Sequence, residues 1–322
     1  MRLIARGCLE AALFISLWLP VVSGDAANAP DAITLPGDRI IPESISAVPD
    51  GTLYIGSAAR GGVLRVRPGA SKAESWIAPG AFGSKSIFGV LADLKSQTLW
   101  VCSNEQTAPG DLRPVAEAES FLIGYDLRTG FGKIKASLPG AKAFCSDIAV
   151  GHDGSVYVAN AAAPQILKFN PQTKRLDVWL SDPQFQPGSG IGLDGIAVAT
   201  DGTVYADTYT AGGFFRIAVD NGKPASTSLM PISRPLIHPG ALRPIWGDAF
   251  FLVEGVGRLD RVTIEGAEAI VDTIRDGLTG PTGVAHANDT TWVAEGQLPN
   301  LHESPSKGQN QSSPFRIDAI HY

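Results

Sequence analysis

The sequence has few charged residues and little helical patterning. Charged residues make up 18% of the chain, the net charge is −6 and the basic residues are scattered. Neither nucleic acid nor an anionic membrane is therefore an expected partner. No long window repeats apolar residues at helical spacing. Glycine and proline, in contrast, number 36 and 23, which favours a turn-rich β protein.

Apolar runs long enough to cross a bilayer are also lacking. The run at residues 11–22 (AALFISLWLPVV) follows Arg2 and Arg6 and precedes several small residues. This order is typical of a secretory signal peptide. A retained membrane anchor is the alternative, but a span needs about 20 apolar residues. We therefore predict a leader over residues 1–26, with cleavage between Gly24 and Ala29, and a periplasmic or secreted protein.

Cysteine is scarce. The chain has 3 cysteines, of which Cys102 and Cys145 lie beyond the predicted leader. In an oxidising compartment this pair permits one disulfide. Two buried free thiols are the equally weighted alternative. The spacing does not suggest a metal site.

What the sequence does contain is a repeat. A strand, a tight turn and a second strand recur six times, and each second strand carries an aromatic residue at the same place. These aromatic residues are Tyr54, Trp100, Tyr157, Tyr205, Phe251 and Trp292. They are 46, 57, 48, 46 and 41 residues apart, which is the spacing of four-stranded propeller blades.

The repeats predict an all-β fold, a single six-bladed β-propeller over residues 30–322. A third and a fourth strand follow each hairpin, except that the last blade lacks its fourth. The segment AITLPG at residues 32–37 resembles the fourth strands of other blades. We therefore expect the N-terminal strand to close the last blade and to leave no open edge. Two polar, Pro-rich insertions at residues 104–119 and 297–313 are expected to be surface loops.

The residues just before each inner strand should lie at the entrance of the central channel. Three of them carry carboxylates, Glu43, Asp147 and Asp194, and no Lys or Arg stands beside them in the sequence. Glu43 and Asp194 occupy the same position of the first and fourth blades, so we expect them to face each other. Converging acids without a basic partner need a cation or raised pKa values. The sequence therefore predicts a divalent metal, with Ca²⁺ favoured and Zn²⁺ or Mn²⁺ as alternatives.

Each acid also has a structural alternative. Asp147 is one position out of register with Glu43 and Asp194, which favours a side chain that caps a turn. Glu43 and Asp194 are candidates for hydrogen bonds to backbone amides. Asn104, Glu105, Glu254 and Glu295 are weaker candidates for the rim of the site, where solvated loop acids are common.

At this point the repeats resemble a known family. PESISAVPDGTLYIG, LDGIAVATDGTVYADT and PTGVAHANDTTWVAEG look like blades of the SMP-30/gluconolactonase family over essentially the whole mature chain. The resemblance implies an axial divalent metal and hydrolysis of sugar lactones. It places metal ligands at Glu43 and Asp194, and a substrate-facing polar group at Ser146 or Asp147.

The fifth blade departs from the family pattern. The family has there an acid that binds the metal and acts as base, whereas this chain has Pro239 and Gly240 preceded by His238. His238 is a candidate replacement near neutral pH, although a turn histidine is the commoner role. We name His238, Ser146 and Asn160 as candidate substrate-binding residues.

Two functions follow from these observations. The first is a metal-dependent lactone or ester hydrolase in which Glu43, Asp194 and Asp147 hold the metal and Asp194 or Asp147 is catalytic. The second is a monomeric, non-catalytic propeller that binds a ligand or protein, because a fold alone does not fix function.

Overall fold

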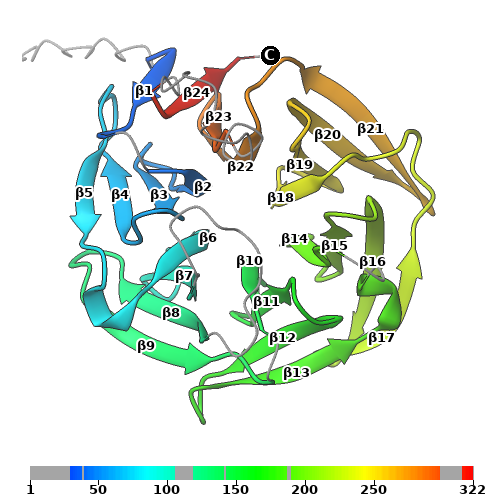
Figure 1. Cartoon of the computed structure of the whole chain (residues 1–322). Coiled ribbons are helices and arrows are strands. Elements are labelled where there is room, and N and C mark those ends of the chain that lie inside the picture. Colours follow the sequence, from blue (N-terminus) through cyan, green and yellow to red (C-terminus); the bar gives the residue numbers. More distant parts are fainter. Residues whose placement is uncertain are drawn as a thin grey trace, which may run out of the picture.

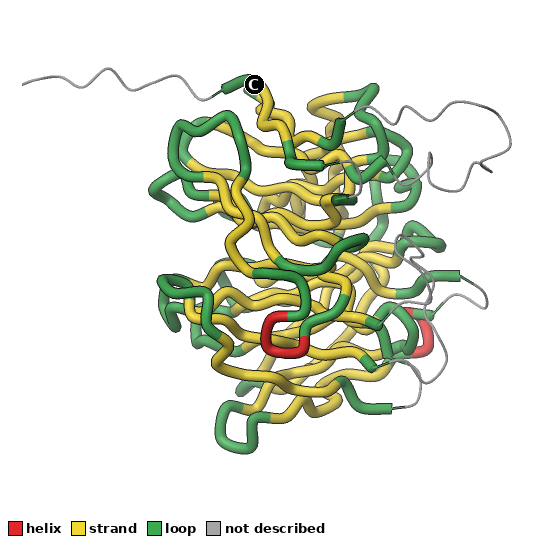
Figure 2. The backbone as a smooth tube through the Cα atoms, turned by 60° about the vertical axis from the view of Figure 1, so that its left-hand side comes forward, coloured by secondary structure: helices red, strands yellow, loops and turns green. Residues whose placement is uncertain are grey.

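The computed structural model describes residues 30–37, 40–105, 119–140, 143–186, 190–297 and 314–321. These residues form strands and, apart from them, only two short 3₁₀ helices, η1 (Ala81–Gly83) and η2 (Pro183–Phe185) (Figure 2). Within these ranges no helix has the length and apolar character needed to cross a membrane. The predicted leader, its cleavage site and most of the two predicted insertions lie outside the described residues.

Six four-stranded antiparallel sheets surround a central axis (Figure 1). The inner strands are β2 (Pro42–Ala47), β6 (Ser86–Asp93), β10 (Cys145–Val150), β14 (Leu193–Val198), β18 (Pro239–Pro244) and β22 (Pro281–Ala287). The second strands are β3 (Leu53–Ser57), β7 (Thr98–Asn104), β11 (Val156–Asn160), β15 (Val204–Thr208), β19 (Ala249–Glu254) and β23 (Thr290–Glu295). The third strands are β4 (Val63–Val66), β8 (Ser120–Asp126), β12 (Gln165–Asn170), β16 (Gly213–Asp220), β20 (Arg258–Glu265) and β24 (Arg316–Ile320). The outer strands are β5 (Glu74–Ile77), β9 (Gly132–Ser137), β13 (Arg175–Ser181), β17 (Lys223–Leu229), β21 (Glu268–Arg275) and β1 (Ala32–Thr34).

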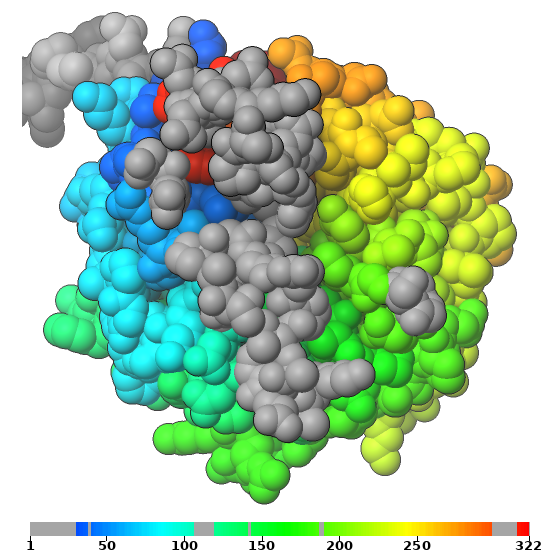
Figure 3. Space-filling view, viewed as in Figure 1, coloured from blue at the N-terminus to red at the C-terminus, as the bar shows by residue number. Residues whose placement is uncertain are grey.

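The N-terminal strand closes the ring. β1 pairs antiparallel with β24, with Ile33 opposite Ile317, and supplies the outer strand of the sixth blade. The colours in Figure 3 follow the chain around the ring, so the first and last blades are neighbours. The predicted six-bladed propeller and its closure are therefore confirmed. Closure leaves no unpaired edge between the two ends of the chain.

The repeated aromatic residues have one structural role. All six are at most 6% exposed, and each pairs with the same position of its inner strand. They pack between neighbouring blades in the apolar clusters that hold the ring together. Burial of such large side chains dominates core energetics, which explains why this position recurs in the sequence.

Every inner strand also contains a bulge. The register of β2 shifts between Pro42 and Ser44, and the other five inner strands shift at the corresponding place. A bulge redirects the side chains of the strand that carries it, and bulges are common beside functional sites. Glu43 and Asp194 lie in these bulges, so the irregularity shared by all blades positions the axial residues.

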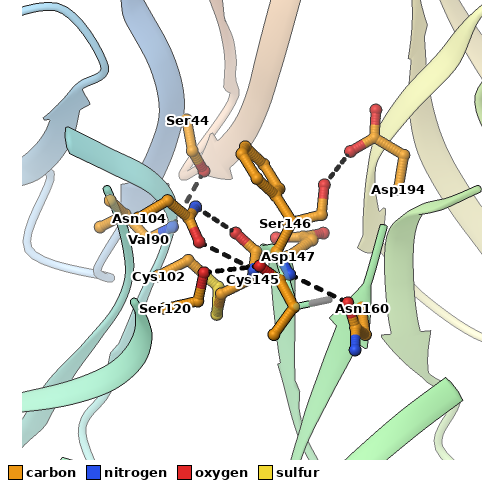
Figure 4. The surroundings of a disulfide bond; sticks show 12 residues. Ser44, Val90, Cys102, Asn104, Ser120, Cys145, Ser146, Asp147, Asn160 and Asp194 are labelled. Atoms are coloured by element: carbon orange, nitrogen blue, oxygen red, sulfur yellow. Dashed lines mark hydrogen bonds between the residues drawn. A yellow bond between two sulfur atoms is a disulfide. The ribbon is translucent and has the colours of Figure 1, made fainter. Parts of the chain in front are cut away.

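A disulfide joins the second and third blades. Cys102 on β7 and Cys145 on β10 are bonded, with a Cα–Cα distance of 5.1 Å (Figure 4). Of the two alternatives for these cysteines, the structure has the disulfide. The bond ties β7 of the second blade to β10, the strand that carries Ser146 and Asp147.

Candidate functional site

Four carboxyl groups and one guanidinium group gather near the propeller axis. Glu43 comes from β2, Asp147 from β10, Asp194 from β14, Asp207 from β15 and Arg243 from β18. We call these five residues the axial cluster. It draws on four of the six blades. The register predicted that Glu43 and Asp194 would lie at the axis, whereas Asp207 and Arg243 were not predicted.

Asp194 is positioned by a hydroxyl group of the neighbouring blade. Ser146 Oγ donates a hydrogen bond to Asp194 Oδ1 (Figure 4). Burial raises the pKa of Asp194 to about 7, the Ser146 hydrogen bond opposes this rise and the charge of Asp147 adds to it. A carboxyl group that titrates near neutral pH can both accept and return a proton.

Glu43 lies in the matching bulge of the first blade. Burial raises the pKa of Glu43 well above its ordinary value, and the charges of Asp194 and Asp147 raise it further. The raised pKa favours the protonated form of Glu43, in which the carboxyl group is a hydrogen-bond donor. Glu43 and Asp194 are partly exposed, in contrast to the rest of the cluster, so both can meet a ligand.

Asp147 is held by Arg243. The two terminal guanidinium nitrogens donate to the two oxygens of Asp147, at 2.6 and 2.8 Å, and the Ile196 N–H donates to the same carboxylate at 3.3 Å. Both side chains are buried. The expectation that the axial acids meet without a basic partner is therefore wrong, because Arg243 reaches Asp147 from two blades away. The positive charge of Arg243 therefore compensates the carboxylate of Asp147 in this bidentate pair.

Asp207 is the least exposed member of the axial cluster. Its side chain is 0% exposed, its Oδ1 accepts the Gly195 N–H at 3.0 Å, and its Oδ2 has no hydrogen-bond partner. Burial raises the pKa of Asp207 well above its ordinary value, and the charge of Asp194 adds to the rise. A Cβ atom at Gly195 would overlap Asp207 Oδ2. Only glycine at this position therefore leaves room for the Asp207 side chain.

His238 lies at the rim of the site, in the loop before β18. It is exposed, has a φ of 53° and stacks on the ring of Tyr209 at 4.7 Å with an interplanar angle of 11°. Burial, together with the charges of Asp194 and Glu43, raises the pKa of Tyr209 to about 12. Tyr209 therefore keeps its hydroxyl proton and lies within electrostatic range of both acids. Tyr209 is not among the site residues that the sequence predicted.

Asn160 lies apart from the axial cluster. It is fully buried at the end of β11, and its Oδ1 accepts the N–H groups of Phe144 at 3.0 Å and Ala162 at 3.2 Å. The weaker candidates also bind backbone or basic groups. Asn104 makes two bonds to Cys145, Glu254 accepts the Ile237 N–H, Glu295 accepts the Thr279 N–H at 2.9 Å, and Glu105 pairs with Lys85 at 3.8 Å.

The axial cluster does not fit a divalent metal. Across the residues that the structure describes, no three His, Cys, Asp or Glu side chains converge closely enough to hold an ion. Both oxygens of Asp147 are already bound by the guanidinium group of Arg243, and one oxygen of Asp194 is bound by the Ser146 hydroxyl. A metal needs several oxygens within about 2.6 Å of one point, and the fifth blade offers Gly240 where an acid would complete the set.

Comparisons with known proteins agree with the fold. No protein-family model and no curated protein matches the chain. Among solved structures, the Malassezia sympodialis allergen Mala s 1 has a TM-score of 0.69 at 13% identity, over 90% of this chain and 96% of that chain. The PQQ-bound aldose sugar dehydrogenase of Streptomyces coelicolor has a TM-score of 0.58 at 14% identity, over 89% and 96%. A putative gluconolactonase has a TM-score of 0.59 at 12% identity, over 92% and 98%.

These neighbours show the propeller fold, and the resemblance to the gluconolactonase family is a likeness of fold at low identity. They include enzymes, one of which carries PQQ. The fold alone does not determine the activity of this chain, which has to be inferred from the residues of its own site.

Proposed function

We propose that this protein hydrolyses a lactone or a related ester at the axial cluster, with Asp194 as general base. The observation that carries the proposal is the environment of Asp194, a partly exposed carboxyl group whose pKa is raised to about 7 and whose Oδ1 is oriented by Ser146. A base works best when its pKa lies near the working pH. The fold that this chain has in common with a putative gluconolactonase supports the choice of substrate class.

The reaction needs only groups that the chain supplies. Asp194 takes a proton from a water molecule as the water oxygen bonds to the substrate carbonyl carbon. In its protonated form, which the raised pKa favours, Glu43 donates a hydrogen bond to the carbonyl oxygen as negative charge develops there. The ring C–O bond then breaks, Asp194 returns its proton to the leaving oxygen, and a hydroxy acid is released.

The sequence predicted a divalent metal and favoured Ca²⁺, but the described residues do not fit a divalent metal. No step of the proposed reaction therefore uses a metal. The export predicted from residues 1–26 remains part of the proposal. The Cys102–Cys145 disulfide supports it, because such bonds persist in oxidising compartments.

Turnover of a panel of γ- and δ-lactones tests the proposal. Asp194→Asn should lower kcat by about 10²–10⁴-fold, the usual contribution of a general base. Asp248→Asn, an exposed acid on the fifth blade, is the matched control and should leave kcat unchanged. In the wild type, kcat should rise with pH through about 7 as Asp194 ionises. Full turnover by Asp194→Asn would exclude this mechanism.

A non-catalytic binding protein is the second candidate. The observation that favours it is Gly240, which stands where the resemblance places a catalytic acid. Specific binding of a small ligand at the axial cluster, with no turnover over the whole panel, would support this function instead.

A further inference from the structure

A cavity of about 200 Å³ lies at the closure of the ring, where the first and sixth blades are neighbours (Figure 1). Its lining includes Leu53 of the first blade and Ile33 and Trp292 of the sixth. The axial cluster is elsewhere, because Glu43 stands at the beginning of β2, whereas Asp50, which lines the cavity, follows its end. The 6 residues of β2 span about 20 Å, so the cavity is separate from the site of the proposed function.

The cavity is apolar inside and polar at its mouth. Ile33, Leu53 and Val66 line it and are each at most 2% exposed. Asp50 and Arg67 also line it, but their side chains are exposed. Binding sites for small molecules have this character, because apolar walls provide burial and a few polar groups fix the orientation of the ligand.

Two buried polar side chains face the cavity without a partner. Thr290 and Trp292 are alternate residues of β23, so their side chains lie on the same face of the strand, and both line the cavity. They are only 7% and 6% exposed. Neither the Thr290 hydroxyl nor the Trp292 indole N–H makes a hydrogen bond with any residue that the structure describes. Buried indole N–H groups usually have a partner, so both groups are available to a ligand.

The charges at the mouth favour an uncharged ligand. Asp50 and Arg67 carry opposite charges, and Arg67 also lies 3.1 Å from Glu74. Asp50 Oδ1 accepts the Thr52 N–H at 2.7 Å, which leaves Oδ2 as an acceptor. The amide of Asn288, which also lines the cavity, both donates and accepts. The mouth therefore offers hydrogen bonds of both kinds without a net charge that would attract an ion.

A sugar ring has the properties that this lining requires. Its hydroxyl groups both donate and accept, so they can bind the Asp50 carboxylate, the Asn288 amide and the Trp292 N–H. Its C–H groups can pack against apolar walls such as Leu53. A purely apolar ring would leave the buried N–H unpaired. Sites for drug-sized molecules measure about 300–1,000 Å³, so a cavity of about 200 Å³ suits a single ring and not an oligosaccharide.

We propose that this cavity binds one uncharged monosaccharide. One hydroxyl oxygen of the sugar accepts the Trp292 N–H, and another hydroxyl donates to Asp50 Oδ2. Because Ile33 belongs to the strand that closes the ring, the bound sugar contacts both ends of the chain and stabilises the closure. The inference goes beyond the proposed function, since it uses no residue of the axial cluster.

Titration with monosaccharides, followed by NMR, tests this proposal. The indole ¹H–¹⁵N signal of Trp292, assigned by its loss in Trp292→Phe, should shift and saturate with D-glucose, D-galactose or D-mannose. Asp50→Asn keeps an oxygen for the Thr52 N–H and should weaken binding by at least ~10-fold, as expected for a hydrogen bond to a charged group. Asp201→Asn is the matched control, because Asp201 accepts the Thr203 N–H in the same turn of the fourth blade at 2.8 Å and does not line the cavity.

A second variant and a comparison ligand sharpen the test. Thr290→Val removes only a hydroxyl and should weaken binding by ~5-fold, and melting curves would confirm that each variant folds. Cyclohexanol, a ring with a single hydroxyl, should bind more weakly than the best sugar. No shift of the Trp292 signal with any of the three sugars would overturn the proposal. Equal or tighter binding of cyclohexanol, or unchanged affinity in both Asp50→Asn and Thr290→Val, would also overturn it. Lactone turnover at the axial cluster is measured separately, so either proposal can fail alone.

Discussion

Two clusters of buried acids lie on this propeller, and their charges are balanced differently. At the rim of the fifth blade, Arg234 binds Glu254 and Asp260, each at 2.6 Å, and Arg258 lies 3.6 Å from Glu254. We call Arg234, Glu254 and Asp260 the rim cluster. In the axial cluster, one arginine faces four acids and is bound to only one of them.

The pKa of Glu254 follows this difference, and that of Asp260 does not. In the rim cluster, burial would raise the pKa of Glu254, but hydrogen bonds from Asp260, the Ile237 N–H and Arg234 hold it below its ordinary value. Burial and the hydrogen bond with Glu254 raise the pKa of Asp260 to about 6, although Arg234 is bound to it. In the axial cluster, burial prevails and raises the pKa of Glu43, Asp194 and Asp207. Buried acids are thus not a functional signal in themselves. Acids that the fold leaves without partners are the better candidates for binding and catalysis.

The largest expected effect comes from removing each arginine. Arg243→Met leaves Asp147 buried and unpaired, which should lower the free energy of unfolding by about 3–5 kcal/mol. Arg234→Met should cost less, because Arg234 is 26% exposed and Arg258 remains near Glu254. Denaturant titration measures both. The double variant Arg243→Met/Asp147→Leu should recover much of the loss. A cost below about 1 kcal/mol for Arg243→Met would show that the pair does not stabilise the axis.

The next effect concerns metal binding. Gly240→Asp adds a fifth-blade acid beside Asp194, in a space that admits its Cβ. Ca²⁺, Mn²⁺ or Zn²⁺ should then raise the melting temperature, and an ion at 100 times its Kd adds about 2.7 kcal/mol. The wild-type melting temperature should not respond. If a divalent ion stabilises the wild type as strongly, the metal site predicted from Glu43, Asp194 and Asp147 is right.

A smaller effect should have opposite signs in the two clusters. The pKa of Asp194 is higher in the folded state than in the unfolded chain, so its contribution to stability is lost as the pH rises from about 4 to about 7. Asp194→Asn should therefore stabilise the protein at pH 8, by about 1–3 kcal/mol. Glu254→Gln weakens the bond to Arg234 and should lower the free energy of unfolding of the protein by about 1–2 kcal/mol. Thermal melting at pH 5 and pH 8 measures both; effects of equal sign would remove the contrast between the clusters.

The sequence predicted the ring and part of the site, because repetition makes equivalent positions comparable. Six aromatic residues at one register defined the blades, and the same register placed Glu43 and Asp194 at the axis. Asp207 and Arg243 were missed, although each breaks the pattern of its own column. Asp207 stands where the other second strands have Gly56, Cys102, Ala159, Val253 and Ala294, and Arg243 stands where the other inner strands have Ser46, Leu91, Ala149, Ala197 and Ala285.

Other features could not be obtained from the register. The Arg243 side chain crosses to Asp147 on a blade two positions away, a path set by side-chain conformation and packing. The pairing of Cys102 with Cys145 and the stack of His238 on Tyr209 also depend on how blades meet. Such contacts join residues far apart in the chain, and the repeat describes only what happens within one blade.

The most direct test of the central claim is the pKa of Asp194 in the folded protein. Carboxyl ¹³C chemical shifts can be followed by NMR from pH 4 to pH 9, with the Asp194 signal assigned by its loss in Asp194→Asn. The uncompensated axial cluster predicts a midpoint at about 7. A midpoint near the ordinary value of 3.8 would mean that Asp194 has a partner in solution, and it would contradict the role of Asp194 as general base.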